Sequence, residues 1–346
     1  MKPQMTIRDV AEAAGFSVNT VSRALNDKPD VSVETKRSIL KTVKQLGYHP
    51  NKLARGLRAN KTHTIGLIIA DIANPYFGTL VKGAEAEARK HNYSIILQNT
   101  DEEYHRELEA VQVMLEERVD GIILSPTQKE RGTVEALLKL GMPFVLMGRC
   151  FADLDTDYVV ADDVQGGYLA TEHLIQLGHK KIVLINGPLH ISSAKERFQG
   201  YCKAFEHYGL KVDASAVVTG AVTMADGYQA TKSLLKRKPR PTAIFAFSDF
   251  VAFGVMRAIR EAGLQIPEDI AVVGYDDNQF ASCAEVPLTT IHVLNEKIGA
   301  TAVHALQEHF TDHHPMMQLR VPVNLVVRRS TCKDAEIKPA KIKVSN

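Results

Sequence analysis

Apolar residues recur at helical spacing in three short segments near the amino terminus. The central one, residues 17–26, reads SVNTVSRALN, and its apolar residues fall on one face of a helix: Val21, Ala24 and Leu25. Ser17 stands where a hydroxyl caps a helix by accepting a backbone hydrogen bond. The segment before it, 6–14, has the same periodicity and is followed by Gly15. Two short helices joined by a tight turn form the helix-turn-helix pattern, whose second helix enters the major groove of DNA.

The next two segments complete this amino-terminal part. A third helix is predicted over 32–46, with Ser32 as its cap and Gly47 at its end. Three short helices can bury only a small core. Residues 49–65, HPNKLARGLRANKTHTI, are basic and allow two interpretations. They form either a flexible linker or a hinge that becomes helical on DNA and inserts Leu57 between base steps of the minor groove.

From residue 64 onward, short apolar runs alternate with amphipathic stretches of helical length. Runs such as IGLIIA are typical of parallel strands that are buried on both faces. Strands are predicted at 64–70, 94–98, 121–125, 143–147, 159–161, 181–186, 216–218, 243–247, 270–274 and 322–327. Helices are predicted at 76–91, 104–118, 165–177, 194–208, 224–236, 250–262 and 295–310. This alternation predicts doubly wound α/β sheets, and so many strands favour two similar subdomains with a cleft between them.

Ligands of doubly wound sheets bind beyond the carboxyl ends of the strands. The polar and aromatic residues at these places are Asp71, Asn74, Tyr76, Phe77, Ser125, Asp162, Asp163, Ser248, Asp249, Tyr275, Asp276 and Asp277. Arg197 lies on a helix that follows another strand. Carboxylates and arginine bond paired hydroxyls, and aromatic rings stack on the C–H face of a sugar, so the set suits a polyhydroxylated ligand. Each aspartate alone fits a helix cap equally well.

The charge distribution strengthens the prediction of nucleic-acid binding. The 346 residues contain 42 Lys or Arg and 40 Asp or Glu, an almost balanced total. Residues 1–61 hold 12 of the cations and 5 of the acids, which is a net charge of +7, and the remainder carries −5. A basic head on a mildly acidic body is typical of a protein that binds nucleic acid.

Other classes of protein find little support in the sequence. No apolar run reaches 18 residues, and the amino terminus lacks the apolar segment of a signal peptide, so we expect a cytoplasmic protein without a membrane span. The four cysteines are far apart, which favours reduced thiols over disulfides or a zinc site. The sequence contains no G-x-S-x-G, G-x-G-x-x-G or P-loop motif. The histidines at 304, 309, 313 and 314 include the spacing i, i+5, which does not place two imidazoles on one helical face, so a solvated, unstructured stretch is favoured over a metal site. We therefore expect no catalytic residues, no metal and no cofactor.

Several motifs together resemble the lactose-repressor/galactose-repressor (LacI/GalR) family of bacterial transcription regulators. They include TIRDVAEAAGFSVNTVSRALN, LGYHPNKLARGL, IGLIIADIANPYF, RFQGY and IAVVGYDD. The resemblance covers residues 6 to about 330 in the family's order. It implies an all-α helix-turn-helix head followed by an α/β core of two doubly wound, periplasmic-binding-protein-like subdomains. The expected domains are the head at 1–48, a hinge at 49–63, the core at 64–330 and a basic tail at 331–346.

The resemblance also implies which residues touch DNA. Val18, Asn19 and Arg23 match the base-reading positions, where their side chains suit a thymine methyl, adenine and guanine. The other head residues expected at DNA are Thr6, Ser17, Thr20 and Ser22. In the hinge the expected contacts are Asn51, Leu53, Ala54 and the minor-groove leucine, Leu57.

For the core, the resemblance implies a small-molecule effector between the subdomains. Arg197 and Asp276 match the family's effector-anchoring arginine and aspartate. The remaining expected effector contacts are Asn74, Phe77, Ser125, Asp163, Ser193 and Asp249. The family has Asp or Asn directly before the residue that matches Asp249, whereas this chain has Ser248. The identity of the family's effectors therefore does not carry over to this chain.

We therefore predict a sequence-specific repressor that binds a palindromic operator as a homodimer under the control of a sugar or sugar derivative. The tail has no leucine heptad, which favours a dimer over a coiled-coil tetramer. Three alternatives stay open: the same regulator with a protein co-effector, an exported sugar-binding protein, and an enzyme.

Overall fold

The computed structural model describes residues 5–48, 61–311 and 315–332. They belong to two compact units, 1–62 and 63–346. The first unit contains three helices, α1 (Ile7–Ala14), α2 (Val18–Leu25) and α3 (Val33–Leu46). Each begins at a hydroxyl cap, as predicted for α2 and α3: the side chains of Thr6, Ser17 and Ser32 accept hydrogen bonds from backbone amides of the first turn.

The three helices enclose a small apolar core. Its buried residues come from all three helices: Val10, Ala11, Val21, Ala24 and Ile39. Gly15 and Gly47 end α1 and α3 in the left-handed conformation, with φ of 72° and 61°. The turn after Gly15 then leads directly to the cap of α2. The helix-turn-helix head predicted from the sequence is confirmed.

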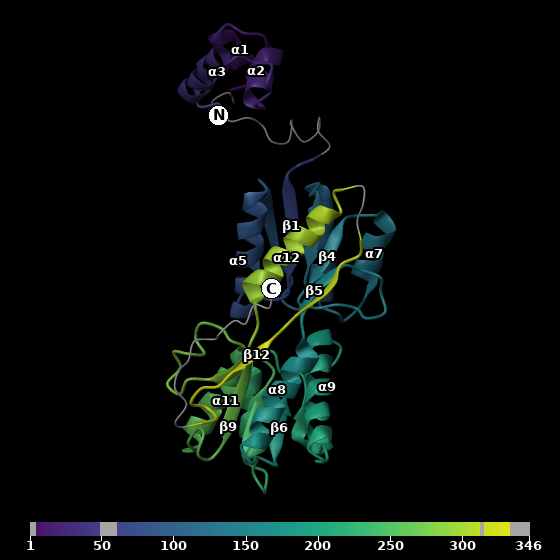
Figure 1. Ribbon diagram of the computed structural model, residues 1–346, viewed down its shortest axis with the longest axis vertical. Coiled ribbons are helices and arrows are strands. Elements are labelled where there is room, and N and C mark those ends of the chain that lie inside the picture. Colours follow the sequence, from purple (N-terminus) through teal and green to yellow (C-terminus); the bar gives the residue numbers. More distant parts are fainter. Residues whose placement is uncertain (1–4, 49–60, 312–314, 333–346) are drawn as a thin grey trace. The chain divides into compact units, whose positions relative to one another are not determined.

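The second unit contains two six-stranded sheets, one in each subdomain (Figure 1). The sheet of the N-terminal subdomain is parallel throughout and has the order β11-β5-β4-β3-β1-β2. Its strands are β1 (Thr64–Ile69), β2 (Ser94–Asn99), β3 (Gly121–Leu124), β4 (Phe144–Met147), β5 (Tyr158–Ala161) and β11 (Gln318–Val321). Its helices are α5 (Pro75–Lys90), α6 (Tyr104–Glu116), α7 (Gly132–Leu140) and α12 (Asn295–Glu308).

The sheet of the C-terminal subdomain has the order β12-β10-β9-β8-β6-β7, and β12 alone among these strands runs antiparallel. Its strands are β6 (Ile182–Ile185), β7 (Val217–Val218), β8 (Ala243–Ala246), β9 (Ala271–Asp276), β10 (Thr289–His292) and β12 (Asn324–Val326). Its helices are α8 (Asp163–Gln176), α9 (Ser192–His207), α10 (Met224–Leu235) and α11 (Asp249–Glu261), with a short 3-10 helix at Ala214–Ala216.

The chain crosses between the subdomains three times, from β5 to α8, from β10 to α12 and from β11 to β12. Because only three connecting segments join the subdomains, they can rotate relative to each other while each keeps its own core. In the N-terminal subdomain α12 packs directly on α5 (Figure 1). Glycines permit this close approach, because a Cβ on Gly83 would lie 2.0 Å from the Glu296 carbonyl oxygen.

The structure confirms the predicted fold class and adds three elements. The strand β10 is short and rich in threonine, and β11 is an edge strand with three of its four residues exposed, so neither shows a long apolar run. The helix α7 has Arg131 at its N-cap position, and this side chain makes no capping hydrogen bond. The sequence therefore lacks the capping residue that usually marks the start of a helix. The predicted last strand, 322–327, is present as β12 but is shorter.

Candidate functional site

A cleft between the two subdomains gathers polar and aromatic side chains from both of them. It is lined by Asp71, Asn74, Tyr76, Phe77, Glu102, Gly148, Arg149, Ser193, Arg197, Val222, Phe247, Ser248 and Asp276. The first seven belong to the N-terminal subdomain and the other six to the C-terminal subdomain. Most follow the carboxyl ends of strands, where doubly wound sheets bind ligands. The cavity volume is about 50 Å³.

Arg197 is the most highly connected side chain of the cleft. Its Nε donates a hydrogen bond of 2.8 Å to Asp163 Oδ1, and Nη1 donates to the Phe247 carbonyl oxygen. Its Nη2 lies 3.9 Å from Asp276 Oδ1. The guanidinium carbon also lies 3.5 Å from the ring centre of Tyr275. Burial opposes its charge, but the surrounding carboxylates outweigh that effect and raise the pKa of Arg197, so the side chain stays cationic.

Arg149 forms a second charged centre on the opposite side of the cleft. Its two terminal nitrogens donate to the two oxygens of Glu102, at 2.8 and 2.5 Å, and Nη1 also donates to the Pro126 carbonyl oxygen at 2.9 Å. The paired geometry fixes the plane of the guanidinium group. The side chain is only 7% exposed, so Arg149 is held in position by its own subdomain.

Aromatic rings supply the apolar part of the cleft. Tyr76 and Phe77 contact each other edge to face, with ring centres 5.0 Å apart. Phe247 lies under Arg197, whose guanidinium carbon is 4.6 Å from the ring centre. Rings beside fixed charged groups can stack on the C–H surface of a ring-shaped ligand while its hydroxyls bond the polar groups.

Asp276 stands at the end of β9 with an unusual backbone. Its φ is 104°, a conformation that costs a non-glycine residue on the order of 1–3 kcal/mol. The carboxyl group is buried, and burial raises its pKa well above the usual range despite the nearby Arg197. Such strain at a cleft, together with a perturbed pKa, is typical of a ligand-binding residue.

Five of the eight effector contacts expected from the sequence line the cleft: Asn74, Phe77, Ser193, Arg197 and Asp276. The other three lie just behind it and bond the protein itself. Ser125 donates to the Met147 carbonyl oxygen at 2.8 Å. Asp163 binds Arg197 from behind, and burial raises its pKa. Asp249 accepts hydrogen bonds from the Thr290 hydroxyl at 2.6 Å and from the Asn278 amide at 2.8 Å.

The sequence reasoning missed five lining residues: Glu102, Gly148, Arg149, Val222 and Phe247. For Gly148 and Arg149 a signal was present, because they directly follow the predicted strand 143–147. Phe247 was assigned to the end of a strand and not to the residues beyond it. Glu102 and Val222 each lie four residues beyond a predicted strand, as Asn74 does, so the same signal was present for them.

In the head, most of the residues expected at DNA are accessible. Thr6, Ser17, Val18, Asn19 and Arg23 are exposed, whereas Thr20 and Ser22 are half-buried. Ser17 and Thr20 bond each other at the start of α2, with their hydroxyl oxygens 2.8 Å apart. The expected hinge contacts, Asn51, Leu53, Ala54 and Leu57, lie outside the described residues.

Arg23 has a partner within the head that the sequence did not suggest. Its guanidinium group forms an ion pair with Asp30, in the turn after α2. Both side chains are about half exposed, so water screens the pair and the net stabilisation is small. The hydrogen bond from Arg23 lowers the pKa of Asp30. The pair holds the long arginine side chain on the exposed face of α2.

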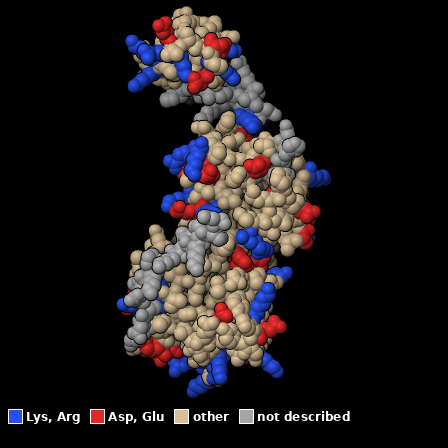
Figure 2. Space-filling view, in the orientation of Figure 1, with Lys and Arg blue, Asp and Glu red and all other residues tan. Residues whose placement is uncertain are grey.

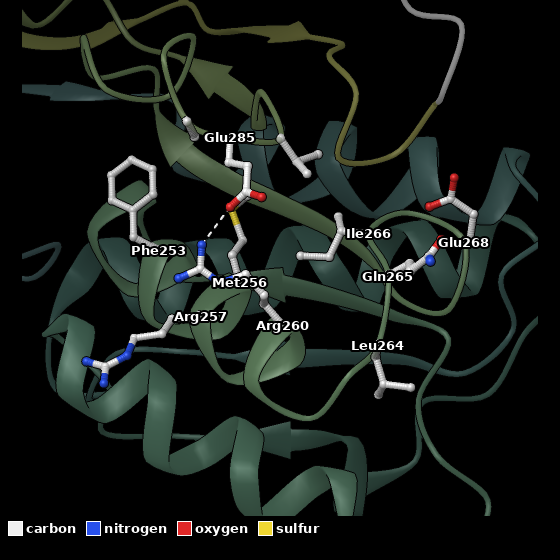
Figure 3. A pocket seen from close by; sticks show the side chains of 11 residues that line it. Phe253, Met256, Arg257, Arg260, Leu264, Gln265, Ile266, Glu268 and Glu285 are labelled. Carbon is white, nitrogen blue, oxygen red and sulfur yellow. Dashed lines mark hydrogen bonds and ion pairs between the residues drawn. The ribbon is translucent and has the colours of Figure 1, made fainter.

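A larger groove lies on the C-terminal subdomain, along α11 (Figure 3). Its volume is about 510 Å³, and Phe253, Met256 and Ile266 are among the apolar residues that line it. Arg260 donates to Glu285 across it at 2.6 Å, and these side chains are 65% and 74% exposed. Its two arginines, Arg257 and Arg260, are already paired with Glu261 and Glu285, so neither is left without a carboxylate partner.

The described residues 5–48, 61–311 and 315–332 contain no cluster of three or more His, Cys, Asp or Glu residues that could hold a metal ion. No helix among them is long and apolar enough to span a bilayer.

A helix-turn-helix head joined to a two-subdomain core with a polar cleft defines a class of ligand-responsive DNA-binding regulators. Comparison with known families agrees. A model described as periplasmic binding proteins and sugar binding domain of LacI family matches residues 62–328. A second, bacterial regulatory proteins of the lacI family, matches residues 6–51. The chain belongs to the LacI family of bacterial transcription regulators, which confirms the predicted family and its DNA-binding regulatory function.

Individual relatives match nearly the whole chain. The ribose operon repressor of Escherichia coli is 37% identical over 307 residues, which are 88% of this chain and 93% of the repressor. The transcriptional repressor PurR of Haemophilus influenzae is 34% identical and covers 94% of this chain and 98% of its own. Among solved structures, the Lac repressor dimer bound to operator and the anti-inducer ONPF has a TM-score of 0.86 and 30% identity, over 95% of this chain and 99% of its own. These relatives are named as repressors.

Proposed function

We propose that this protein is a homodimeric repressor whose operator affinity is set by a neutral monosaccharide bound in the cleft. The cleft's lining carries the proposal, since both subdomains contribute polar and aromatic groups to one small space. A ligand that touches both subdomains binds one relative orientation of the subdomains better than another. This difference in affinity allows the ligand to shift the equilibrium between the two orientations.

The charges of the cleft favour a neutral ligand over an anion. Each arginine already has a carboxylate partner, Glu102 for Arg149 and Asp163 for Arg197. Asp276 and Asp71 add further acidic groups, so no net positive charge remains for a carboxylate or phosphate. Hydroxyl groups can both donate to the aspartates and accept from the arginines. A polyhydroxylated ring stacked on Phe77 or Phe247 satisfies these requirements.

Size restricts the ligand further. The cavity of about 50 Å³ is far smaller than the roughly 300–1,000 Å³ of sites for drug-sized ligands. A small ligand such as a monosaccharide therefore suits the cleft better than a drug-sized one. D-ribose is the first sugar to test, because the ribose operon repressor is the relative with 37% identity.

The proposed DNA interface is the exposed face of α2. Val18, Asn19 and Arg23 would read base edges in the major groove, and the hydroxyls of Thr6, Ser17, Thr20 and Ser22 would contact the backbone. The hinge residues Asn51, Leu53, Ala54 and Leu57 remain predicted contacts in the minor groove. Two heads of a dimer would bind half-sites of a near-palindrome about one helical turn apart. Because a repressor must reach its operator DNA, we place the protein in the bacterial cytoplasm.

An apolar groove is the proposed contact between protomers. It has a volume of about 490 Å³ and is lined by Ala73, Pro75, Met224, Phe250, Phe253, Phe280, Cys283 and Ala284. Phe280 is 51% exposed and Met224 45%, and they belong to one contiguous apolar lining, the kind of patch that marks an interaction surface. The groove is lined by both subdomains, so a second copy seated there would sense their relative orientation.

The test uses the full-length chain and an operator selected from random duplexes. Calorimetric titration with D-ribose should show saturable binding. Saturating ribose should change the affinity for the operator by the same factor by which bound operator changes the affinity for ribose. Arg197→Lys should lose sugar binding and the sugar response. The matched change Arg131→Lys, at an exposed arginine of the same protein, should alter neither. Sugar binding that leaves operator affinity unchanged would overturn the proposed regulation.

A further inference from the structure

A second cavity lies beyond the amino-terminal ends of strands in the C-terminal sheet, whereas the effector cleft lies beyond their carboxyl ends. It has a volume of about 400 Å³ and is formed where β6, β7 and β8 begin, whereas the cleft adjoins the ends of strands. Six cations line it: Lys180, Lys181, Lys211, Arg237, Lys238 and Arg240. Asp213 is its one carboxylate among the described residues. Figure 2 shows Lys and Arg side chains at the end of the C-terminal subdomain that lies away from the N-terminal subdomain.

The cations of this basal cavity outnumber the one carboxylate, Asp213, that lines it with them. Among the residues that the structure describes, none of the six forms an ion pair. Arg237 donates to the Ser215 carbonyl oxygen at 2.6 Å, and Asp213 accepts from the Ser215 amide at 2.8 Å. Elsewhere on this subdomain exposed arginines do have partners, as Arg257 does in Glu261. Six like charges around one cavity repel one another, and a bound anion would relieve that repulsion.

The floor of the basal cavity is apolar. It contains Ile182, Val183, Tyr201, Phe205 and Leu234, which are all buried. Tyr201 is fully buried and donates its hydroxyl to the Ile182 carbonyl oxygen at 2.9 Å, so the floor is held in place. A concave apolar floor surrounded by cations differs from a flat basic surface. It can take a ligand that has both a hydrophobic body and several negative charges.

We propose that the basal cavity is a second ligand site, specific for a small multiply phosphorylated organic molecule. The cations come from three separate segments, 180–181, 211 and 237–240, and converge on one space of about 400 Å³. That volume lies within the roughly 300–1,000 Å³ of small-molecule sites, whereas duplex DNA needs an extended basic surface. The cavity would add a second chemical input to the repressor, separate from the sugar.

The test compares two double variants of the full-length protein. Lys180→Gln with Lys181→Gln removes two cations of the basal cavity. Lys139→Gln with Lys297→Gln removes two exposed, unpaired lysines of the N-terminal subdomain and leaves the same net charge. Adenosine triphosphate and inorganic tripolyphosphate are the probes, titrated by calorimetry at fixed ionic strength. Any binding of these probes to the basic head or the cleft is common to both variants.

We expect the basal variant to bind adenosine triphosphate about tenfold more weakly than the control variant, since each charged contact contributes to affinity. Tripolyphosphate should bind less tightly than the nucleotide because it cannot use the apolar floor. Hydrogen exchange is the second readout: the nucleotide should slow exchange of backbone amides in 211–217 and 236–242 of the wild type. Equal affinities of the two variants, or no protection of these segments, would overturn the proposal. So would a tripolyphosphate affinity equal to that of the nucleotide.

Discussion

The cost in folding free energy of breaking the buried ion pair Arg197–Asp163 can be estimated from the structure. The side chains are 6% and 4% exposed, and the bond between them is 2.8 Å. Arg197→Met leaves the Asp163 carboxyl buried without its partner. Removing one member of a buried ion pair costs about 3–5 kcal/mol of folding free energy. Because burial already raises the pKa of Asp163, the carboxyl group can take up a proton in the variant, which favours the lower end of that range.

The double variant Arg197→Met with Asp163→Leu separates stability from ligand binding. Replacing both members of the pair by apolar residues removes the charge stranded on Asp163, so the free energy of unfolding should return most of the way to the wild-type value, short of it by the interaction that Asp276 loses with Arg197. Sugar binding should not return, since a lost hydrogen bond from a charged donor is worth about 1.5–3 kcal/mol, or about 10- to 150-fold in affinity. Urea denaturation and calorimetry measure the two quantities.

Two outcomes would refute this reasoning. If Arg197→Met is as stable as the wild type, removing Arg197 does not leave an unpaired buried charge on Asp163. If the double variant binds sugar with wild-type affinity, Arg197 is not the effector anchor. Arg131→Met is the control for stability, because that arginine is exposed and should change the free energy of unfolding by less than about 0.5 kcal/mol.

Four further predictions concern the head, the core and the subdomain contact. Arg23→Ala should weaken binding to the selected operator by about 1–3 kcal/mol and relax specificity at one base pair, as anisotropy with base-substituted duplexes would show; equal loss on random DNA would make Arg23 a phosphate contact. Burial raises the pKa of Asp249 to about 7, above its unfolded value, so the contribution of this carboxyl group to wild-type stability should fall as the pH rises from about 4 to 7, by up to about 1.4 kcal/mol per unit. Asp249→Asn should flatten that part of the urea-denaturation profile, and an unchanged slope would contradict the assignment. Phe280→Asp should convert the dimer to monomer in analytical ultracentrifugation, with an intact fold; a dimer that persists would exclude the proposed face. Glu196→Gln breaks the pair with Arg320, which joins the subdomains, and should change sugar affinity by up to about fivefold without unfolding the protein; no change would exclude a role in closure.

Local signals explain how much of the fold could be predicted from the sequence. The caps Thr6, Ser17 and Ser32 and the glycines that end α1 and α3 act within one helical turn, so they are legible without tertiary information. Fully buried parallel strands such as β3 are likewise legible as apolar runs. Elements such as the edge strand β11 depend on distant pairing partners and leave no comparable local signal.

The cleft was less predictable, because its chemistry depends on pairings between distant segments. Asp163 and Asp249 follow strands in the sequence, as a ligand contact would, yet their carboxyl groups are used by Arg197 and Thr290. Whether such a side chain faces the ligand or a neighbouring element is decided by packing. The pairing of Arg149 with Glu102, 47 residues away, is equally invisible in the sequence.

The helix α9 connects the cleft with the contact between the subdomains. It carries Arg197 and begins at Ser192, whose amide donates to Gln128 of the N-terminal subdomain at 2.8 Å. Glu196 on the same helix accepts two hydrogen bonds, of 2.7 and 2.8 Å, from Arg320 of the N-terminal sheet. A rigid helix cannot move its ligand-binding residue without moving these two contacts as well. A ligand that displaces Arg197 therefore changes the bonds that set the angle between the subdomains, which is the physical requirement for coupling the sugar to the DNA.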